Sequence, residues 1–176
     1  MNNPMHPLGK LGGPMKTMTR VLMILCLALP FAGCKKQEAP VAAVKAPLPA
    51  PVNDNRQAWL DYLSDVVTRN MGGIQNQPYV YMLPGESSAG FQDSYDRLLD
   101  KAKGDVSRGI ISGNMLAYGS PASAKMADLV IAAFAGVPAG SMKGVKVLFI
   151  GKPVDSERVK AALAPTGVDY VFVEAK

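Results

Sequence analysis

The second part of the chain alternates short apolar runs with amphipathic stretches, and this alternation restricts the fold more than any other feature. The apolar runs are Tyr79–Leu83, Ile110–Tyr118 with Gly113 as an expected bulge, Val145–Ile150 and Val168–Val173. Runs that are apolar at successive positions are typical of strands covered on both faces, and such strands occur mainly in parallel sheets. We therefore expect four parallel strands.

The stretches before and between these runs have helical spacing. In the first, Trp59, Leu63, Val66 and Val67 recur at intervals that place them on one face of a helix. The further helices are expected from Phe91 to Gly104, from the start signal Ser120-Pro121 to Gly136, and over Asp155–Ala164. The first helix is expected to begin with Asp54 and Gln57 as its capping pair and to end at Gly72-Gly73.

The resulting order is α-β-α-β-α-β-α-β, which predicts an α/β fold: a small three-layer sandwich with a mainly parallel four-stranded sheet. Gly85, Gly119 and Gly151 each follow an expected strand and precede an expected helix. They mark one strand–turn–helix unit used three times.

The amino-terminal part has a different pattern. The apolar run of residues 21–33 follows the basic residues Lys16 and Arg20. As a helix it would be roughly 20 Å long, too short to cross a membrane core of about 30 Å. A basic region, a short apolar region and small residues at its end are typical of a secretory signal peptide. Residues 1–14 are unlike such a signal, which leaves Met15 and Met18 open as start positions.

The apolar run ends in Phe31-Ala32-Gly33-Cys34. This sequence resembles the lipobox of bacterial lipoproteins, with Phe31 in the place of the family's usual Leu. The resemblance implies cleavage before Cys34 and a diacylglycerol, with a further acyl chain such as palmitate, on that cysteine. Because Lys35 and Lys36 follow instead of Asp, the family's sorting rule implies the outer membrane, with the domain in the periplasm.

Residues 34–52 form the lipidated cysteine and a tether. The segment is rich in Ala and Pro, and proline favours extended backbone. The sequence thus predicts three parts: a signal peptide over residues 1–33, the tether over 34–52, and a periplasmic domain over 53–176.

The charge and residue types of the domain exclude several functions. The chain carries a formal charge of +5, but six of its 19 basic residues and one of its 14 acidic residues precede residue 53. The domain is therefore neutral, which argues against nucleic-acid binding. Cys26, Cys34 and His6 also precede it. Ser–His catalysis and thiolate metal sites are excluded there, and no cofactor motif occurs. We expect no metal, no cofactor and no enzyme activity.

The best candidate ligand site lies in the loops after the strands, because ligands of parallel sheets bind at the carboxyl ends of the strands. The candidate residues are Gly85, Glu86, Ser87, Ser88, Gly90, Ser120 and Lys152. The Gly85–Gly90 loop could hold an anion through its backbone amides. The simpler interpretation, which we favour, is that its serines cap the following helix.

Two hypotheses for function remain. The leading one is a non-catalytic protein-interaction module that binds another envelope protein. The alternative is a small-ligand or anion-binding domain that uses the loops at the strand ends. Polar side chains converging at those ends would favour the second hypothesis, and an apolar patch elsewhere would favour the first.

Overall fold

The computed structural model describes residues 46–176. The expected signal peptide, Cys34 and most of the tether lie outside this range. The helices are α1 (Arg56–Asn70), α2 (Phe91–Ser107), α3 (Ser123–Phe134), α4 (Pro153–Leu163) and a short 3-10 turn η1 (Ala164–Thr166). The strands are β1 (Tyr79–Met82), β2 (Met115–Gly119), β3 (Lys146–Gly151) and β4 (Asp169–Glu174). The predicted order of helices and strands is confirmed.

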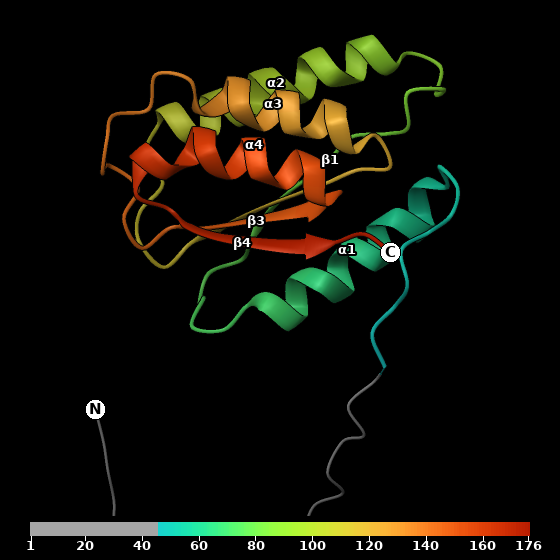
Figure 1. Cartoon of the computed structure of the whole chain (residues 1–176), viewed down its shortest axis with the longest axis horizontal. Helices are drawn as coiled ribbons and strands as arrows, with labels where there is room; N and C mark the ends of the chain where they lie inside the picture. Colours follow the sequence, from blue (N-terminus) through green and yellow to red (C-terminus); the bar gives the residue numbers. More distant parts are fainter. Residues whose placement is uncertain (1–45) are drawn as a thin grey trace, which may run out of the picture. The chain divides into compact units, whose positions relative to one another are not determined.

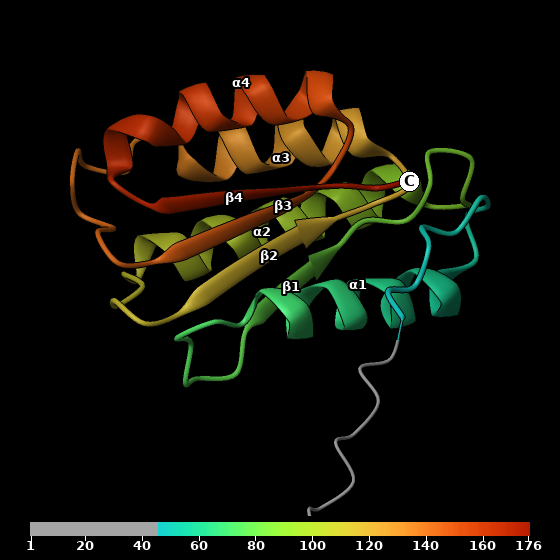
Figure 2. The ribbon, with the colours of Figure 1, turned by 60° about the horizontal axis from the view of Figure 1, so that its bottom comes forward.

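The sheet has the order β1-β2-β3-β4, and all three pairs are parallel. Right-handed crossovers between strands that follow one another in space place every connecting helix on the same face. Accordingly α2, α3 and α4 lie side by side on one face, and α1 lies on the other (Figures 1 and 2). The predicted three-layer α/β sandwich with a parallel four-stranded sheet is confirmed.

The core consists of two clusters, one on each face of the sheet. On the α1 face, Trp59, Tyr62, Leu63, Val66 and Val67 pack against β2 and β3. On the other face, side chains of α2, α3 and α4 cover the alternate residues of all four strands. The strands are apolar at successive positions because both of their faces are buried.

Several boundaries differ from the sequence prediction. The α1 helix is capped by Asn55, whose side chain accepts a hydrogen bond from the Ala58 amide at 2.9 Å, and not by Asp54. Strand β2 begins at Met115, because Gly113 lies in a turn with a φ of +83° and forms no bulge. Helix α2 continues past Gly104 to Ser107.

The segment before α1 is part of the folded unit. The Leu48 amide donates to the Asp65 carboxylate at 3.1 Å, and the Ala50 amide donates to the carbonyl of Lys176 at 3.0 Å. Both side chains pack against the α1 cluster. We call residues 47–50 the strap. The sequence pattern places them in the tether, but in the structure they belong to the folded part.

We predict that Leu48→Ser lowers the free energy of unfolding by about 1 kcal/mol, because half-buried apolar surface is lost from the α1 face. Val52→Ser is the matched control, since Val52 is fully exposed and should leave the stability unchanged. Urea denaturation of residues 46–176 measures both variants. Equal midpoints for the two would show that the strap does not stabilise the fold.

No helix of residues 46–176 is long and apolar enough to cross a membrane.

Candidate functional site

All seven candidate ligand residues lie at the carboxyl edge of the sheet, in the loops after β1, β2 and β3. The three glycines of the repeated unit have a shared role there. A Cβ on Gly85 would lie 1.9 Å from Asp54 Oδ2, one on Gly119 would lie 2.3 Å from the Leu63 side chain, and one on Gly151 would lie 2.5 Å from Ser123 Oγ. Each glycine thus leaves room for a side chain from another part of the chain, which explains why these three positions are glycine.

The Gly85–Gly90 loop holds a carboxylate of the protein itself. Ser87 Oγ donates to Asp54 Oδ2 at 2.9 Å, and the Asp54 carboxylate lies against Gly85. The serines do not cap α2: its N-cap is Gly90, with a φ of +69°, and no side chain accepts from the first turn. The capping prediction is therefore wrong, because Ser87 is drawn toward Asp54 instead. The side chains of Glu86 and Ser88 form no hydrogen bond or ion pair with the described residues.

Ser120 is a structural link between two loops. Its side chain is buried, donates to the Leu83 carbonyl at 2.9 Å and accepts from the Ala122 amide at 2.9 Å. The sequence predicts Ser120 as the N-cap of α3. That prediction is wrong, because the helix begins only at Ser123. With both of its hydrogen bonds made inside the protein, this hydroxyl is not presented to a ligand.

A second link, which the sequence reasoning missed, joins α3 and α4. Ser123 Oγ donates to Asp155 Oδ2 at 2.7 Å and accepts from the backbone amide of Lys152 at 2.8 Å. Arg158 donates to Asp155 and Asp128. Ser123 and Asp155 are both buried. They are separated by 32 residues, so only the sheet topology brings them together, and no local pattern could reveal the pair.

Three serines at the strand ends therefore bind groups of the protein itself. Asp54 holds Ser87, Leu83 holds Ser120, and Asp155 holds Ser123. Among the described residues there is also no group of three or more His, Cys, Asp or Glu side chains placed to hold a metal ion. At this edge the three serines link parts of the chain that are distant in sequence.

A buried tyrosine pair lies between β1, β2 and α2. The rings of Tyr81 and Tyr118 are stacked, with centroids 4.6 Å apart and planes 10° apart. Tyr81 donates its hydroxyl to Asp105 at 2.8 Å, whereas the Tyr118 hydroxyl is buried without a hydrogen-bond partner in the part of the chain that is described. Burial raises the pKa of both phenols, so both remain protonated at neutral pH.

We predict that Tyr118→Phe raises the free energy of unfolding by about 1 kcal/mol, because it removes a buried hydroxyl that has no partner. Tyr81→Phe is the matched control and should lower it by a similar amount, since it breaks the bond to Asp105. Thermal unfolding of both variants checks the signs. A lower midpoint for Tyr118→Phe would mean that the hydroxyl is satisfied in solution.

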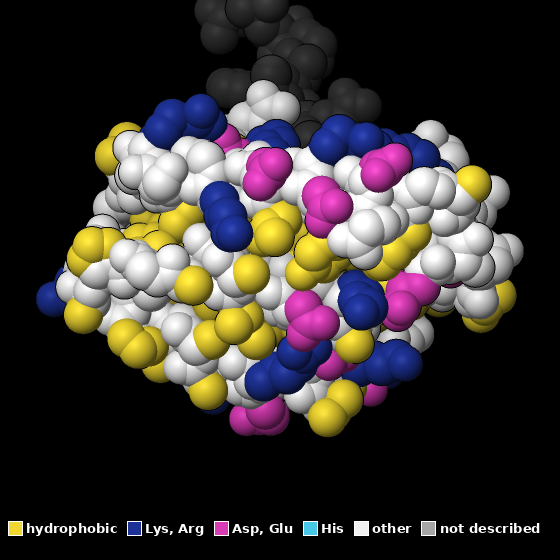
Figure 3. All heavy atoms as spheres, turned by 90° about the horizontal axis from the view of Figure 1, so that it is seen from above, with side chains coloured by type: hydrophobic (Ala, Val, Ile, Leu, Met, Phe, Trp, Pro, Cys, Tyr) yellow, Lys and Arg dark blue, Asp and Glu magenta, His cyan; other side chains and the backbone are white. Residues whose placement is uncertain are grey.

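An open groove lies on the helical face, away from the strand ends. It has a volume of about 590 Å³ and lies between the carboxyl end of α2, the end of α3 and the loop that follows α3. Figure 3 shows this face, on which hydrophobic side chains reach the surface between scattered charged ones. The apolar side chains that line the groove are those of Val106, Ile110, Ala133, Ala135, Val137, Pro138 and Met142.

The groove exists because two helices end close together and small residues line it. Gly109 and Gly136 have φ values of +84° and +90°, conformations that end a helix and are easily adopted by glycine. Gly104 and Ala133 leave space on the facing sides of α2 and α3. The cluster of small residues near Gly136 is the signal that could have revealed the groove in the sequence.

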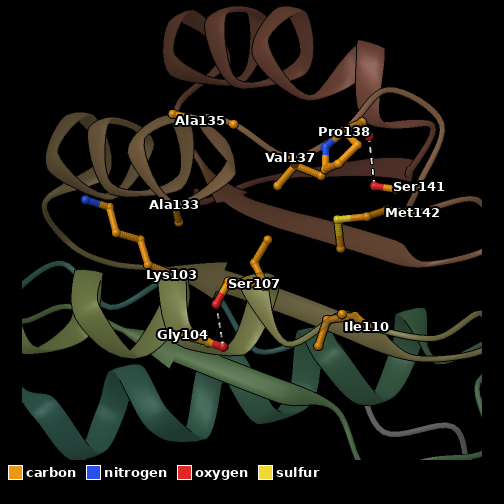
Figure 4. Close-up of a pocket in the computed structure, with 13 residues that line it drawn as sticks. Lys103, Gly104, Ser107, Ile110, Ala133, Ala135, Val137, Pro138, Ser141 and Met142 are labelled. Atoms are coloured by element: carbon orange, nitrogen blue, oxygen red, sulfur yellow. Dashed lines mark hydrogen bonds between the residues drawn. The ribbon is translucent and has the colours of Figure 1, made fainter.

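The groove has few polar side chains, and both of its serine hydroxyls donate to backbone carbonyls. Ser107 Oγ donates to the Gly104 carbonyl at 3.1 Å, and Ser141 Oγ donates to the Pro138 carbonyl at 2.8 Å (Figure 4). Lys103 is the charged side chain among the lining residues, and it extends from α2 toward α3. The groove can therefore receive an apolar group and place a negative charge beside Lys103.

Comparisons of the chain with protein-family models, with curated proteins and with solved structures give no match.

Proposed function

We propose that the protein is a bacterial lipoprotein anchored in the outer membrane through lipid on Cys34, and that its periplasmic domain is a non-catalytic interaction module. The groove between α2 and α3 is the surface that binds a second envelope protein. The groove carries this proposal: it is open and mostly apolar, and it lies apart from the strand ends. Apolar surface of this kind favours a binding site for another protein.

The chemistry of the groove indicates what the partner presents. Its apolar lining fits an aliphatic or aromatic side chain, and Lys103 fits a carboxylate next to it. The partner segment is thus apolar with a neighbouring Asp or Glu. The alternative function, binding of a small anion at the strand ends, has less support, because Ser87, Ser120 and Ser123 are already bound to groups of the protein.

The proposal is tested by placing a photo-crosslinking amino acid at Val137, on the groove, or at Thr68, on the exposed side of α1. Irradiation of intact cells should give one discrete adduct from position 137 and none from position 68. Adducts of equal yield from both positions, or none from position 137, would contradict the proposal.

The role of the charge is tested in the same assay with Lys103→Glu. We expect the adduct yield to fall about fivefold, the effect of roughly 1 kcal/mol from a rim charge. Lys160→Glu is the matched control, because Lys160 is exposed on α4 and does not line the groove. An unchanged yield with Lys103→Glu would show that the partner places no carboxylate beside Lys103.

A further inference from the structure

The sheet ends in β4, whose outer edge has no neighbouring strand; just beyond it, the Lys176 carbonyl accepts from the Ala50 amide of the strap. Strand β4 pairs with β3 on one side only. Its central residues, Tyr170–Val173, are all apolar and only half-buried. Natural edge strands usually carry proline, an inward-pointing lysine or a bulge that prevents pairing with other chains. Residues 169–174 contain neither Pro nor Lys, and they pair with β3 residue by residue without a bulge.

The backbone of β4 presents a regular row of free groups. The Asp169 amide donates to the Val145 carbonyl at 2.8 Å, and the Ala175 amide donates to the Gly151 carbonyl at 3.0 Å. Odd-numbered residues therefore face β3. Because alternate residues of a strand face opposite sides, the amides and carbonyls of Tyr170, Phe172 and Glu174 point away from the sheet. None of the described residues forms a hydrogen bond with these outward groups.

We propose that the β4 edge binds the β4 edge of a second copy of the chain, antiparallel and centred on Phe172. In this register Phe172 faces Phe172 of the other copy, and Tyr170 faces Glu174. Every outward residue then meets an outward residue, which gives about six backbone hydrogen bonds. The two sheets join into one continuous sheet.

The charges of β4 are compatible with this arrangement. The centre of the strand is uncharged, and its acidic residues, Asp169 and Glu174, stand at its two ends. In the proposed register Asp169 faces Ala175 and Glu174 faces Tyr170, so no like charges lie opposite each other. Strand β1, the other edge, has four residues and offers fewer hydrogen bonds.

The position of the strap favours a second copy over an unrelated strand. Joining two sheets edge to edge in antiparallel fashion requires a two-fold axis perpendicular to the sheet, which keeps both α1 layers on the same side. The strap packs on the α1 face, so the first described residues of both copies lie on that side of the joined sheet. Two copies anchored in one membrane, as the proposed function holds, therefore have their straps on the same side of the joined sheet, and their confinement to the membrane raises their effective concentration.

The test is a disulfide between copies. Asp169 and Ala175 face β3 and would form a pair without direct hydrogen bonds, with Cα atoms about 4.5 Å apart, within the range of a disulfide. The natural cysteines, Cys26 and Cys34, both lie far upstream. The full chain carrying Asp169→Cys and Ala175→Cys, expressed in cells that export it, should migrate as a covalent dimer that reducing agent converts to monomer.

The single variants are matched controls. Either cysteine alone lies roughly 20 Å from its equivalent in the other copy and should give no dimer. Adding Glu174→Pro to the double variant should abolish the dimer, because it removes an outward amide at a place where an edge strand tolerates proline. Val80→Lys, on the β1 edge, should leave the dimer unchanged. Protease resistance of each variant confirms that it is folded.

The proposal is overturned if the folded double variant stays monomeric, if the single variants form equal amounts of dimer, or if the disulfide species contains a different protein. Since β4 contributes no residue to the groove, these results do not depend on whether the groove binds a partner.

Discussion

Replacing Cys34 with alanine should abolish lipid attachment completely and leave the precursor uncut at this position. In the proposed lipoprotein, the diacylglycerol and the further acyl chain are both attached to this one residue. Each acyl methylene buried in the membrane contributes about 0.8 kcal/mol, so a protein without these chains should be lost from the outer-membrane fraction. Metabolic labelling with a palmitate analogue, followed by membrane fractionation, measures both effects.

Cys26→Ala is the matched control for this experiment. Cys26 lies within the apolar run, and its loss should change neither labelling nor cleavage. If the Cys34→Ala protein is still labelled, or if it is still found in the outer-membrane fraction at the normal amount, the anchor proposed here is wrong.

Asp105→Ala should lower the free energy of unfolding by about 2–3 kcal/mol at neutral pH. Asp105 is buried and accepts hydrogen bonds from Tyr81 at 2.8 Å, from Lys101 at 2.5 Å and from Arg108. Lys101 and Arg108 are largely exposed, so their ion pairs contribute little. Most of the loss comes from the Tyr81 hydroxyl, which would remain buried without an acceptor.

A double-mutant cycle identifies that source. In a Tyr81→Phe background, Asp105→Ala should cost clearly less than in the natural protein, because no hydroxyl is left unpaired. Urea denaturation of the four proteins gives the coupling. If the two losses simply add, the hydrogen bond between Tyr81 and Asp105 does not stabilise the fold.

The same carboxyl predicts how stability depends on pH. Burial raises the pKa of Asp105, but the hydrogen bonds from Lys101 and Tyr81 and the nearby positive charges together lower it by more. The pKa of Asp105 therefore lies below its usual value. A carboxyl whose pKa is lowered by folding stabilises the protein above its unfolded pKa and loses this contribution as the pH falls. We therefore expect stability to fall below about pH 4, and to fall less steeply in Asp105→Asn.

The sequence was sufficient to predict the fold because each element carries its own signal. The apolar runs of the strands and the helical spacing of residues such as Trp59 and Leu63 are local patterns. The order of elements then limits the topology to a parallel sheet with right-handed crossovers. The ends of helices are harder to predict where a side chain can form more than one kind of hydrogen bond. Ser120 has the sequence context of a helix cap, but its side chain links the loops after β1 and β2.

The sites depend on contacts between distant parts of the chain. Ser123 meets Asp155, and Asp54 meets Ser87, only after the sheet has brought their loops to one edge. The groove likewise requires the ends of α2 and α3 to lie next to each other. The prolines of the strap favour extended backbone, and no local pattern distinguishes an extended segment that packs on the domain from one that does not.

Binding of a second protein in the groove can be measured by hydrogen–deuterium exchange, which compares the protein in native outer-membrane vesicles with the same protein purified in detergent. If a second protein occupies the groove, amides of residues 104–110 and 133–142 should exchange at least about tenfold more slowly in the vesicles, while those of α1 should be unchanged. Equal exchange of the groove amides in the two samples would contradict it. So would slower exchange confined to residues 84–90 and 119–122, which would place the bound group at the strand ends.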